Sequence, residues 1–387
     1  MDTDSLIDRR RAVALFAAAP FAIAAAPGPE PSVALQKWSD DIVKANALPG
    51  LIVAVRRPDG RVLTASAGFS DVENRLPMRL ENRLLGASMG KTFVSALCLK
   101  LQRQGVFSLD DKISTWLGRE AWFSRLPNGS ELTLRTLLNH SSGLHDFIDE
   151  PAYGQARAST LRTDWVLPTE GKIALVLDLP PLFPAGQGYK YSDTNYILVG
   201  MCIERATGSN YFRMIRRYFL EPLHLTRTEP ALGRKLRNLA VGYTIDGGRY
   251  ERFGLPHRLV DDGVLVYNPA TEWTGGGLVT NPVDLVAWIH AVFSGQAVDP
   301  RDLQELERPT RAADSGQAQY YGQGMKILNT PAGRLVGHWG SMAGYSGFVA
   351  HLPGDGSAIA LQTNLTAFDT LTVETSLAGL AATLARA

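Results

Sequence analysis

Residues 86–92 read GASMGKT, and three catalytic signatures overlap there. The first five letters fit G-x-S-x-G, the nucleophile elbow. Ser88 and Lys91 fit S-x-x-K, a serine followed by a lysine one helical turn later. The whole stretch also comes close to G-x-x-x-x-G-K-[ST], the loop that holds phosphate groups. These patterns imply three different chemistries, and the rest of the chain distinguishes between them.

The spacing of the glycines argues against the phosphate loop. Such a loop needs four residues between its glycines, so that successive backbone N–H groups wrap around a phosphate. Only three residues separate Gly86 from Gly90. No long apolar strand leads into the stretch, and no later apolar strand ends in an Asp suited to magnesium.

The nucleophile elbow matches letter for letter, but its surroundings fit poorly. An elbow needs a strand that runs straight into the serine, a helix behind it, and an acidic residue and a histidine later in the chain. Residues 71–85, DVENRLPMRLENRLL, do not read as such a strand, and no H-G-G-G oxyanion loop precedes them. His338 or His351 could still complete a triad with Ser88, so an α/β-hydrolase esterase stays open as an alternative.

The serine–lysine pattern has a clear chemical rationale. Residues three apart on a helix are neighbours on its surface, so a helix that starts at Ser88 brings the Lys91 amine within hydrogen-bond reach. Burial disfavours the charged form of a lysine, which can then accept the serine proton. The helix N-terminus adds positive potential where an oxyanion forms. Because S-x-x-K arises often by chance, it needs partners elsewhere in the chain.

The two ends of the chain read as strands and the middle reads as helices. LIVAVRR and RVLTASAG flank a Pro-Asp-Gly turn and predict a hairpin, and further strand-like runs follow residue 320. We therefore predict an α+β fold, an α/β sandwich with an antiparallel sheet flanked by terminal helices. Residues 30–82 and 275–387 would form the sheet domain, and residues 83–274 an inserted, mostly helical domain. We expect the active site in the cleft between them.

The first residues predict export. Arg9-Arg10-Arg11 precedes an apolar run at 12–26, followed by PGPEPS. A basic stretch, a short apolar run and small residues are typical of a secretory signal, and the paired arginines resemble a twin-arginine signal. The run is short for a membrane span. We expect a periplasmic or secreted protein, a monomer, with no stable membrane span once residues 1–26 are removed.

Composition and cysteines limit which partners, disulfides and metal sites the chain is expected to have. A net charge of +1 gives no sign of a nucleic-acid partner. Cys98 and Cys202 lie in apolar helical stretches, and we favour buried free thiols over a disulfide. Nothing has the spacing of a zinc site, and we read His140 and His145 as parts of a helix end and turn. The sequence therefore predicts no metal and no cofactor.

Two later segments supply the partners of the serine–lysine pair. Residues 183–200 read FPAGQGYKYSDTNYILVG, and residues 335–348 read LVGHWGSMAGYSGF. Together with S-x-x-K, they resemble the ordered motifs of class C β-lactamases and penicillin-binding DD-carboxypeptidases, namely Y-x-N and then K-T-G or H-x-G. TLLNHSSGLHDF at 136–147 and TGGGLVTNPVDLVAWIHAVFSG at 274–295 also resemble segments of that family. The resemblance covers the chain from about residue 35 to its end.

The resemblance implies a role for each matching residue. Ser88 would be the acylated nucleophile, Lys91 its activating partner and Tyr191 a second proton-transfer group. The backbone N–H groups of Ser88 and Ser341 would form the oxyanion hole. His338 would bind a substrate carboxylate or polarise Tyr191. Gly340 would leave room for the substrate backbone.

Two positions depart from the family pattern. Asp193 stands where Y-x-N ends in Asn, and an ionised Asp can only accept hydrogen bonds. A carboxylate beside Lys91 favours the ammonium and opposes its use as a base. Trp339 stands where a threonine often helps to bind a carboxylate, which points away from β-lactams unless the indole faces away from the cleft.

We therefore expect an exported serine hydrolase that forms an acyl-enzyme on Ser88. Its substrate would be a small molecule or a peptidoglycan peptide: a D-alanyl peptide, a β-lactam, a D-amino-acid amide or a small ester. A penicillin or peptidoglycan sensor that is acylated without turnover is the alternative that Asp193 keeps open.

Overall fold

The computed structural model describes residues 31–245, 250–311, 320–330, 333–366 and 380. The predicted signal at 1–26 lies outside the described residues, as does the expected C-terminal one of the two terminal helices apart from Leu380.

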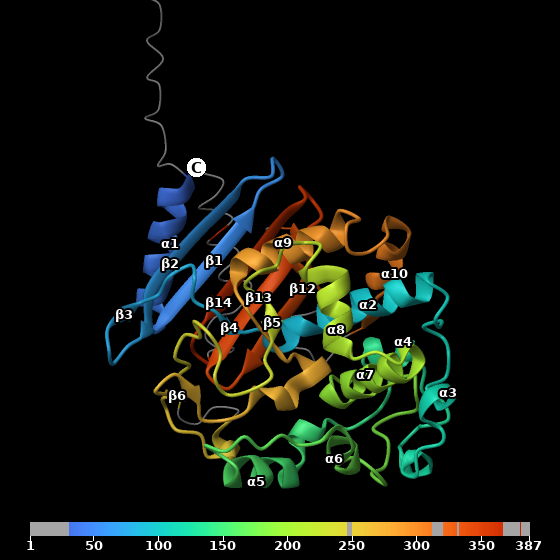
Figure 1. Cartoon of the computed structure of the whole chain (residues 1–387). Coiled ribbons are helices and arrows are strands. Elements are labelled where there is room, and N and C mark those ends of the chain that lie inside the picture. The colour runs from blue at the N-terminus through green and yellow to red at the C-terminus, as the bar shows by residue number, and fades with distance from the viewer. Residues whose placement is uncertain (1–30, 246–249, 312–319, 331–332, 367–379, 381–387) are drawn as a thin grey trace, which may run out of the picture.

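One antiparallel sheet of nine strands unites the two ends of the chain (Figure 1). Its order is β3-β2-β1-β14-β13-β12-β11-β10-β9. β1 (Gly50–Arg56) is the N-terminal strand that joins the C-terminal strands: it pairs with β14 (Ser357–Thr363), with Leu51 opposite Thr363. The predicted hairpin is present, since β1 also pairs with β2. The other strands are β2 (Val62–Asp71), β3 (Leu76–Pro77), β9 (Thr310–Arg311), β10 (Tyr320–Tyr321), β11 (Lys326–Thr330), β12 (Gly333–Met342) and β13 (Tyr345–Leu352).

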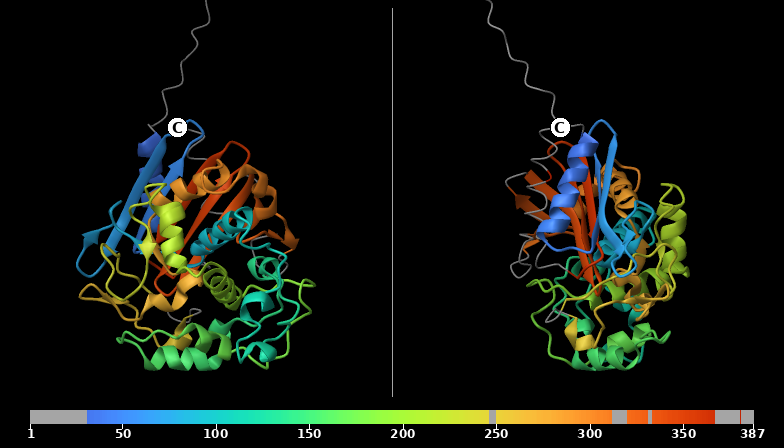
Figure 2. Two further views of the ribbon diagram at one scale, coloured as in Figure 1. Left: turned by 45° about the vertical axis from the view of Figure 1, so that its right-hand side comes forward. Right: turned by 90° about the vertical axis from the view of Figure 1, so that its left-hand side faces the viewer.

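Both faces of this sheet are covered, because apolar side chains alternate on its central strands. On β14, Ile359 and Leu361 pack in the same cluster as α1 (Pro31–Ala45), while Ala358 and Ala360 pack in the cluster of α9 (Pro282–Phe293). Figure 2 shows the sheet edge-on with the two helices on its two sides. These layers confirm the predicted α+β fold.

The middle of the chain is mostly helical and lies beside one end of the sheet (Figure 1). α2 (Lys91–Arg103) is buried from Lys91 to Leu99, which agrees with its nearly all-round apolar sequence. It packs against α7 (Asp193–Thr207) and against β12. The shorter helices are α3 (Ser114–Leu117), α4 (Leu134–Leu138), α5 (Pro151–Ser159), α6 (Thr169–Ala174), α8 (Tyr211–Ile215) and α10 (Leu303–Leu306).

The middle region also contains short strands. A small sheet, β4-β8-β5, joins residues before the serine to residues after the glycine run at 275–277. Its strands and those of a separate two-stranded ladder are β4 (Leu84–Leu85), β5 (Glu229–Pro230) and β8 (Leu278–Thr280), then β6 (Val260–Asp261) and β7 (Val264–Leu265). The domain boundaries proposed from the sequence stay a prediction.

Cys98 and Cys202 are both buried, free thiols, as predicted. Within the ranges that the structure describes, no helix is both long enough and apolar enough to cross a membrane.

Candidate active site

Ser88 lies in a short turn of 3₁₀ helix, η1 (Ala87–Gly90), that leads directly into α2. The turn is fixed on the small sheet by the Gly86 N–H, which donates to the Leu278 carbonyl at 2.7 Å. Ala87 has φ 45°, a left-handed conformation that is costly for a residue with a side chain. Such strain is typical of functional sites, where surrounding contacts hold it in place. Ser88 itself is half-buried.

Lys91 is completely buried and donates three hydrogen bonds. Its Nζ is 3.2 Å from Ser88 Oγ and 2.5 Å from the Gly275 carbonyl oxygen, and it forms a short ion pair with the Asp193 carboxylate. An ammonium has three N–H donors, and each has an acceptor here. The arrangement therefore holds Lys91 in its charged form, as a hydrogen-bond donor to Ser88.

Gly275 is a functional residue that the motif comparison missed. Its signal was the T-G-G-G run at 274–277, which brings backbone very close to the serine turn. A Cβ at Gly276, which has φ 156°, would lie 2.3 Å from the Ala87 carbonyl oxygen. Only glycine fits at position 276, and this close contact between the two segments lets the Gly275 carbonyl reach Lys91.

Tyr191 stands just before α7 and faces two cations. The centre of its ring lies 5.1 Å from Lys91 Nζ and 5.5 Å from the Nζ of Lys326 on β11. Its other side packs on the His140 ring, with centroids 4.2 Å apart. Lys326 was not singled out in the sequence, because it belongs to no motif and comes from the neighbouring strand.

His140 supports the start of α7 and is not a metal ligand in this arrangement. Its Nδ1 accepts hydrogen bonds from the Ser192 backbone N–H at 3.2 Å and the Asn195 side chain at 3.0 Å. Burial, with the charges of Lys91 and Lys326, lowers its pKa well below the usual range, so the ring is neutral. Among the described residues, no three His, Cys, Asp or Glu side chains cluster as a metal site would require.

His338 is not free to bind a substrate carboxylate, which was one of the two roles that the resemblance implied; the other, polarising Tyr191, stays a prediction. Its Nδ1 lies 2.6 Å from the Trp339 carbonyl, which can only accept, and its Nε2 lies 2.9 Å from the Tyr321 hydroxyl. Burial and the nearby Lys326 lower its pKa well below the usual range. The neutral ring thus donates from Nδ1 and accepts from Tyr321 at Nε2. Neither nitrogen is left to bind a substrate carboxylate, so that expectation is corrected.

The contacts of Gly340 and Trp339 also differ from what the resemblance implied for these residues. A Cβ at Gly340 would lie 2.7 Å from the Gly86 carbonyl oxygen and 3.0 Å from the Ser88 nitrogen. The glycine therefore makes room for the serine turn, not for substrate backbone. The Trp339 ring packs 4.1 Å from the Nζ of Lys326, the lysine whose Nζ also lies 5.5 Å from the Tyr191 ring. Trp339 is not among the residues that line the pocket beside Ser88.

The order and placement of these segments match a known family. The Beta-lactamase family model matches residues 35–382. The chain belongs to the Beta-lactamase family. The α/β-hydrolase alternative is thereby overturned: the main sheet is antiparallel, and β4, the strand before Ser88, has two residues and lies outside it.

Similar proteins of this family include several with named activities. Penicillin-binding protein 4* of Bacillus subtilis is 27% identical over 290 residues, 73% of this chain and 60% of that protein. A D-aminopeptidase of Brucella anthropi is 25% identical over 298 residues, 77% of this chain and 52% of that protein. The chain thus matches only between half and two thirds of the length of these relatives.

The structure of D-amino acid amidase from Ochrobactrum anthropi SV3, complexed with L-phenylalanine, is similar to this one with a TM-score of 0.77. The two chains are 24% identical, and the match covers 92% of this chain and 98% of the amidase. At this identity the similarity concerns the fold.

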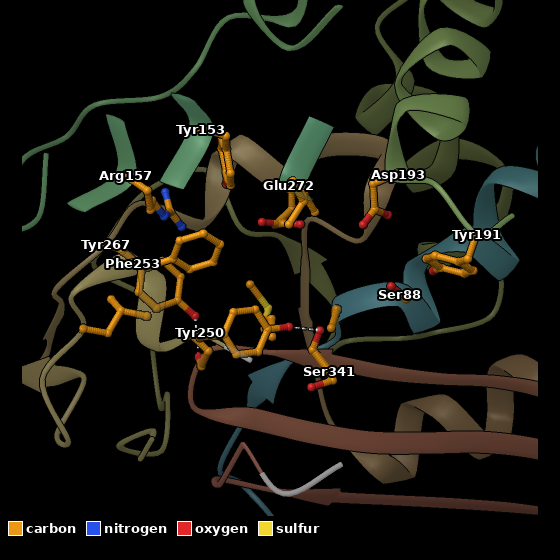
Figure 3. A pocket seen from close by; sticks show the side chains of 15 residues that line it. Ser88, Tyr153, Arg157, Tyr191, Asp193, Tyr250, Phe253, Tyr267, Glu272 and Ser341 are labelled. Atoms are coloured by element: carbon orange, nitrogen blue, oxygen red, sulfur yellow. Dashed lines mark hydrogen bonds between the residues drawn. The ribbon is translucent and has the colours of Figure 1, made fainter. Parts of the chain in front are cut away.

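In this member of the Beta-lactamase family, Ser88 opens into a pocket whose wall includes several aromatic rings (Figure 3). Ser341, at the end of β12, lies beside Ser88, and its carbonyl accepts from the Tyr250 hydroxyl at 2.7 Å. Tyr191 and Asp193 also line the pocket. Sequence reasoning missed the rest of the wall, because these residues lie in loops and on α5 without any motif: Tyr153, Arg157, Tyr250, Phe253, Tyr267 and Glu272.

Proposed function

We propose that this protein hydrolyses an amide or ester through an acyl-enzyme on Ser88. The observation that carries the proposal is the hydrogen bond from buried Lys91 to Ser88 Oγ at the wall of a pocket that Tyr191 and Ser341 also line. Lysine at this distance orients the hydroxyl and stabilises negative charge that develops on it.

Tyr191 is the proposed proton carrier, because Lys91 is engaged as an ammonium. Ser88 Oγ attacks the substrate carbonyl carbon, and its proton passes to the Tyr191 oxygen. The positive charges of Lys91 and Lys326 near the ring favour a phenolate that can take this proton. Tyr191 then gives the proton to the leaving nitrogen or oxygen as its bond to the carbonyl carbon breaks.

Deacylation follows the same route in reverse. Water attacks the ester carbon, loses a proton to Tyr191, and Ser88 recovers a proton as the acid leaves. In both steps the negative charge on the carbonyl oxygen would be met by the backbone N–H groups of Ser88 and Ser341. No cofactor is needed for either step.

The relatives' names support several amide substrates without choosing between them. They include a penicillin-binding protein, D-aminopeptidases and, by fold, a D-amino acid amidase. We propose export on the basis of the N-terminal signal pattern, and a monomeric enzyme.

The test is to incubate the protein with a penicillin and with a p-nitrophenyl ester, following turnover and intact mass. We expect ester turnover with a transient adduct on Ser88, which Ser88→Ala abolishes and Lys91→Ala and Tyr191→Phe reduce by about 100-fold or more. The matched control is Lys100→Ala, which removes another lysine of α2, one that is partly exposed near the end of the helix. Turnover that persists in Ser88→Ala would contradict the proposal.

A sensor is the second candidate, and the Lys91–Asp193 ion pair favours it. An ammonium so firmly paired cannot itself take a proton from the deacylating water, so turnover depends on Tyr191 alone, and without that transfer the acyl-enzyme would persist. A stable Ser88 adduct with either compound, without product release, would identify the sensor.

A further inference from the structure

The pocket has two ends, and the proposed chemistry assigns each to one part of the substrate. Figure 3 shows Tyr191 on one side of Ser88 and Arg157 with Tyr267 on the other. If Tyr191 protonates the leaving group, the leaving group lies on its side. The acyl group then occupies the end bounded by aromatic rings, Glu272 and Arg157.

Glu272 is the charged group at this end without a bonding partner. Among the described residues, its carboxylate takes part in no hydrogen bond and no ion pair, although it is half-buried in the pocket wall. Burial and the nearby Asp193 raise its pKa, while the charges of Arg157, Lys91 and Lys172 oppose that rise. The carboxylate lines the pocket and its oxygens are not occupied by a protein donor among the described residues, so they are available to a donor on a ligand.

Arg157 is already held as part of the wall. Its guanidinium donates to the Asn268 carbonyl at 3.2 Å and lies 4.7 Å from the centre of the Tyr267 ring. No carboxylate of the described residues lies within ion-pair distance of Arg157. Its charge therefore helps to keep Glu272 ionised without occupying the Glu272 oxygens.

The backbone fixes Glu272 relative to the serine. It lies three residues before Gly275, whose carbonyl accepts from Lys91. Between them, Trp273 has φ 41°, and Thr274 Oγ1 donates to the Tyr196 carbonyl at 2.7 Å. A segment held at both sides can present a carboxylate at a set distance from the reacting carbon, which specificity requires.

We propose that Glu272 binds the free α-ammonium of an aminoacyl group, while Tyr153, Tyr250 and Phe253 enclose its side chain. The substrates are then amino-acid amides, or peptides with a free N-terminus, and not N-acylated ones. This inference rests on the proposed function, because it places the acyl group by the side on which Tyr191 acts. Asp193 does not compete for the ammonium, since its charge is paired with Lys91.

The test compares p-nitroanilides of phenylalanine, in both enantiomers, with those of 3-phenylpropanoate, N-acetylphenylalanine and succinate. We expect a higher kcat/KM for one free-amino enantiomer than for its desamino and acetylated counterparts. Glu272→Gln should lower the amino-to-desamino ratio about 10- to 100-fold, mainly through KM, because hydrogen bonds between charged groups have that weight. Glu251→Gln, at an exposed glutamate beside the pocket loop, should keep the wild-type ratio.

Three outcomes would overturn the inference: equal rates with and without the amine, an unchanged ratio in Glu272→Gln, or a preference for succinate that Arg157→Gln removes. Calorimetry of phenylalaninamide binding to Ser88→Ala separates the two proposals. If phenylalaninamide binding depends on Glu272 but the protein turns over none of the compounds, the proposed function is contradicted and the inference about Glu272 is supported. Ser88-dependent turnover without discrimination would do the opposite.

Discussion

At the scale of single residues, Asp193 decides the charge of the site. Its carboxylate pairs with Lys91, which also donates to Ser88 and Gly275. An asparagine, the residue that the family motif has here, would offer an uncharged oxygen to the same ammonium. The proton of Ser88 must therefore go to a group other than an ammonium that is fully engaged.

Asp193→Asn should shift the pH profile of acylation toward lower pH. Loss of a negative charge beside Lys91 leaves more positive potential around Tyr191, the proposed acceptor of the serine proton, and this potential favours its phenolate at lower pH. Single-turnover acylation by a p-nitrophenyl ester, measured between pH 5 and 9, checks this. Asp164→Asn, at a carboxylate that is 88% exposed, should leave the profile in place. An unshifted profile in Asp193→Asn would count against the charge argument.

Ser88, Lys91, Tyr191 and Ser341 could be found from the sequence because each sits in a short ordered motif. Lys326, Gly275 and Glu272 could not be assigned, because their roles exist only once strands and loops far apart in the chain meet. His338 shows the converse error: its motif was visible, but its hydrogen bond to Tyr321 depends on a strand pairing that no motif records.

At the scale of elements, the site depends on how closely β12 approaches the serine turn. At the closest point Gly340 of β12 lies against the backbone of Gly86 and Ser88. The strand carries Ser341, so the separation of β12 from η1 sets the distance between the two proposed oxyanion donors.

Gly340→Ala should therefore lower kcat about 100-fold, because a displacement near 1 Å at a catalytic centre has an effect of this size. The added Cβ would meet the Gly86 carbonyl oxygen at 2.7 Å and force β12 and the turn apart. Ester turnover measures the effect, and circular dichroism shows whether the fold persists. Gly354→Ala, where a Cβ meets nothing within 4 Å, serves as the control and should remain active.

The contact between α2 and α9 fixes the helix that carries Lys91. Phe93 stacks on Trp288 with ring centroids 3.8 Å apart, and the indole N–H donates to Thr92 Oγ1 at 2.8 Å. Trp288→Ala should lower the free energy of unfolding by about 3–5 kcal/mol, the usual cost of removing a fully buried large aromatic side chain. Urea unfolding would measure it, with Val33→Ala, at a 58% exposed valine, as the control. A loss below about 1 kcal/mol would show that this contact is not a support of the fold.

Local patterns predicted most elements but not all their ends. In the predicted helical middle, the apolar stretch LTLRTLLNH at 132–140 forms a helix only over Leu134–Leu138, because His140 adopts φ 59° and turns the chain toward Ser192. Apolar alternation cannot reveal such a turn, since the residue that ends the helix does so through a distant partner.

At the scale of the whole molecule, the fold depends on pairing between its two ends. That β1 and β14 share a sheet could be inferred because both termini read as strands around a helical middle. The residues of the pocket wall could not be foreseen, because the wall combines five separate parts of the chain: residues 87–88, 148–157, 191–193, 250–272 and 341–343. Two buried histidines, His140 and His338, lie near the site lysines Lys91 and Lys326.

These histidines should make the whole molecule less stable in mild acid. The pKa of each is well below 6.5 in the folded protein, through burial and the nearby lysines. The unfolded chain has histidine pKa values near 6.5, so below that pH it binds protons that the folded protein excludes. Their contribution is therefore fully present above about pH 6.5 and is lost as the pH falls. Each should lower the free energy of unfolding by roughly 1 kcal/mol between pH 7.5 and 5.5.

Urea unfolding at pH 7.5, 6.5 and 5.5 checks this dependence. His338→Gln should be less stable at every pH, since it loses the Tyr321 contact. Its free energy of unfolding should nevertheless fall less steeply as the pH is lowered, because one of the two buried histidines is gone. His224→Gln, at an exposed ring, should keep the full slope. An equal slope in His338→Gln and the unchanged protein would mean that His338 is protonated with the fold intact. The hydrogen bond that Nε2 accepts from Tyr321 would then be absent at low pH, and the ring would be available to an anionic ligand after all.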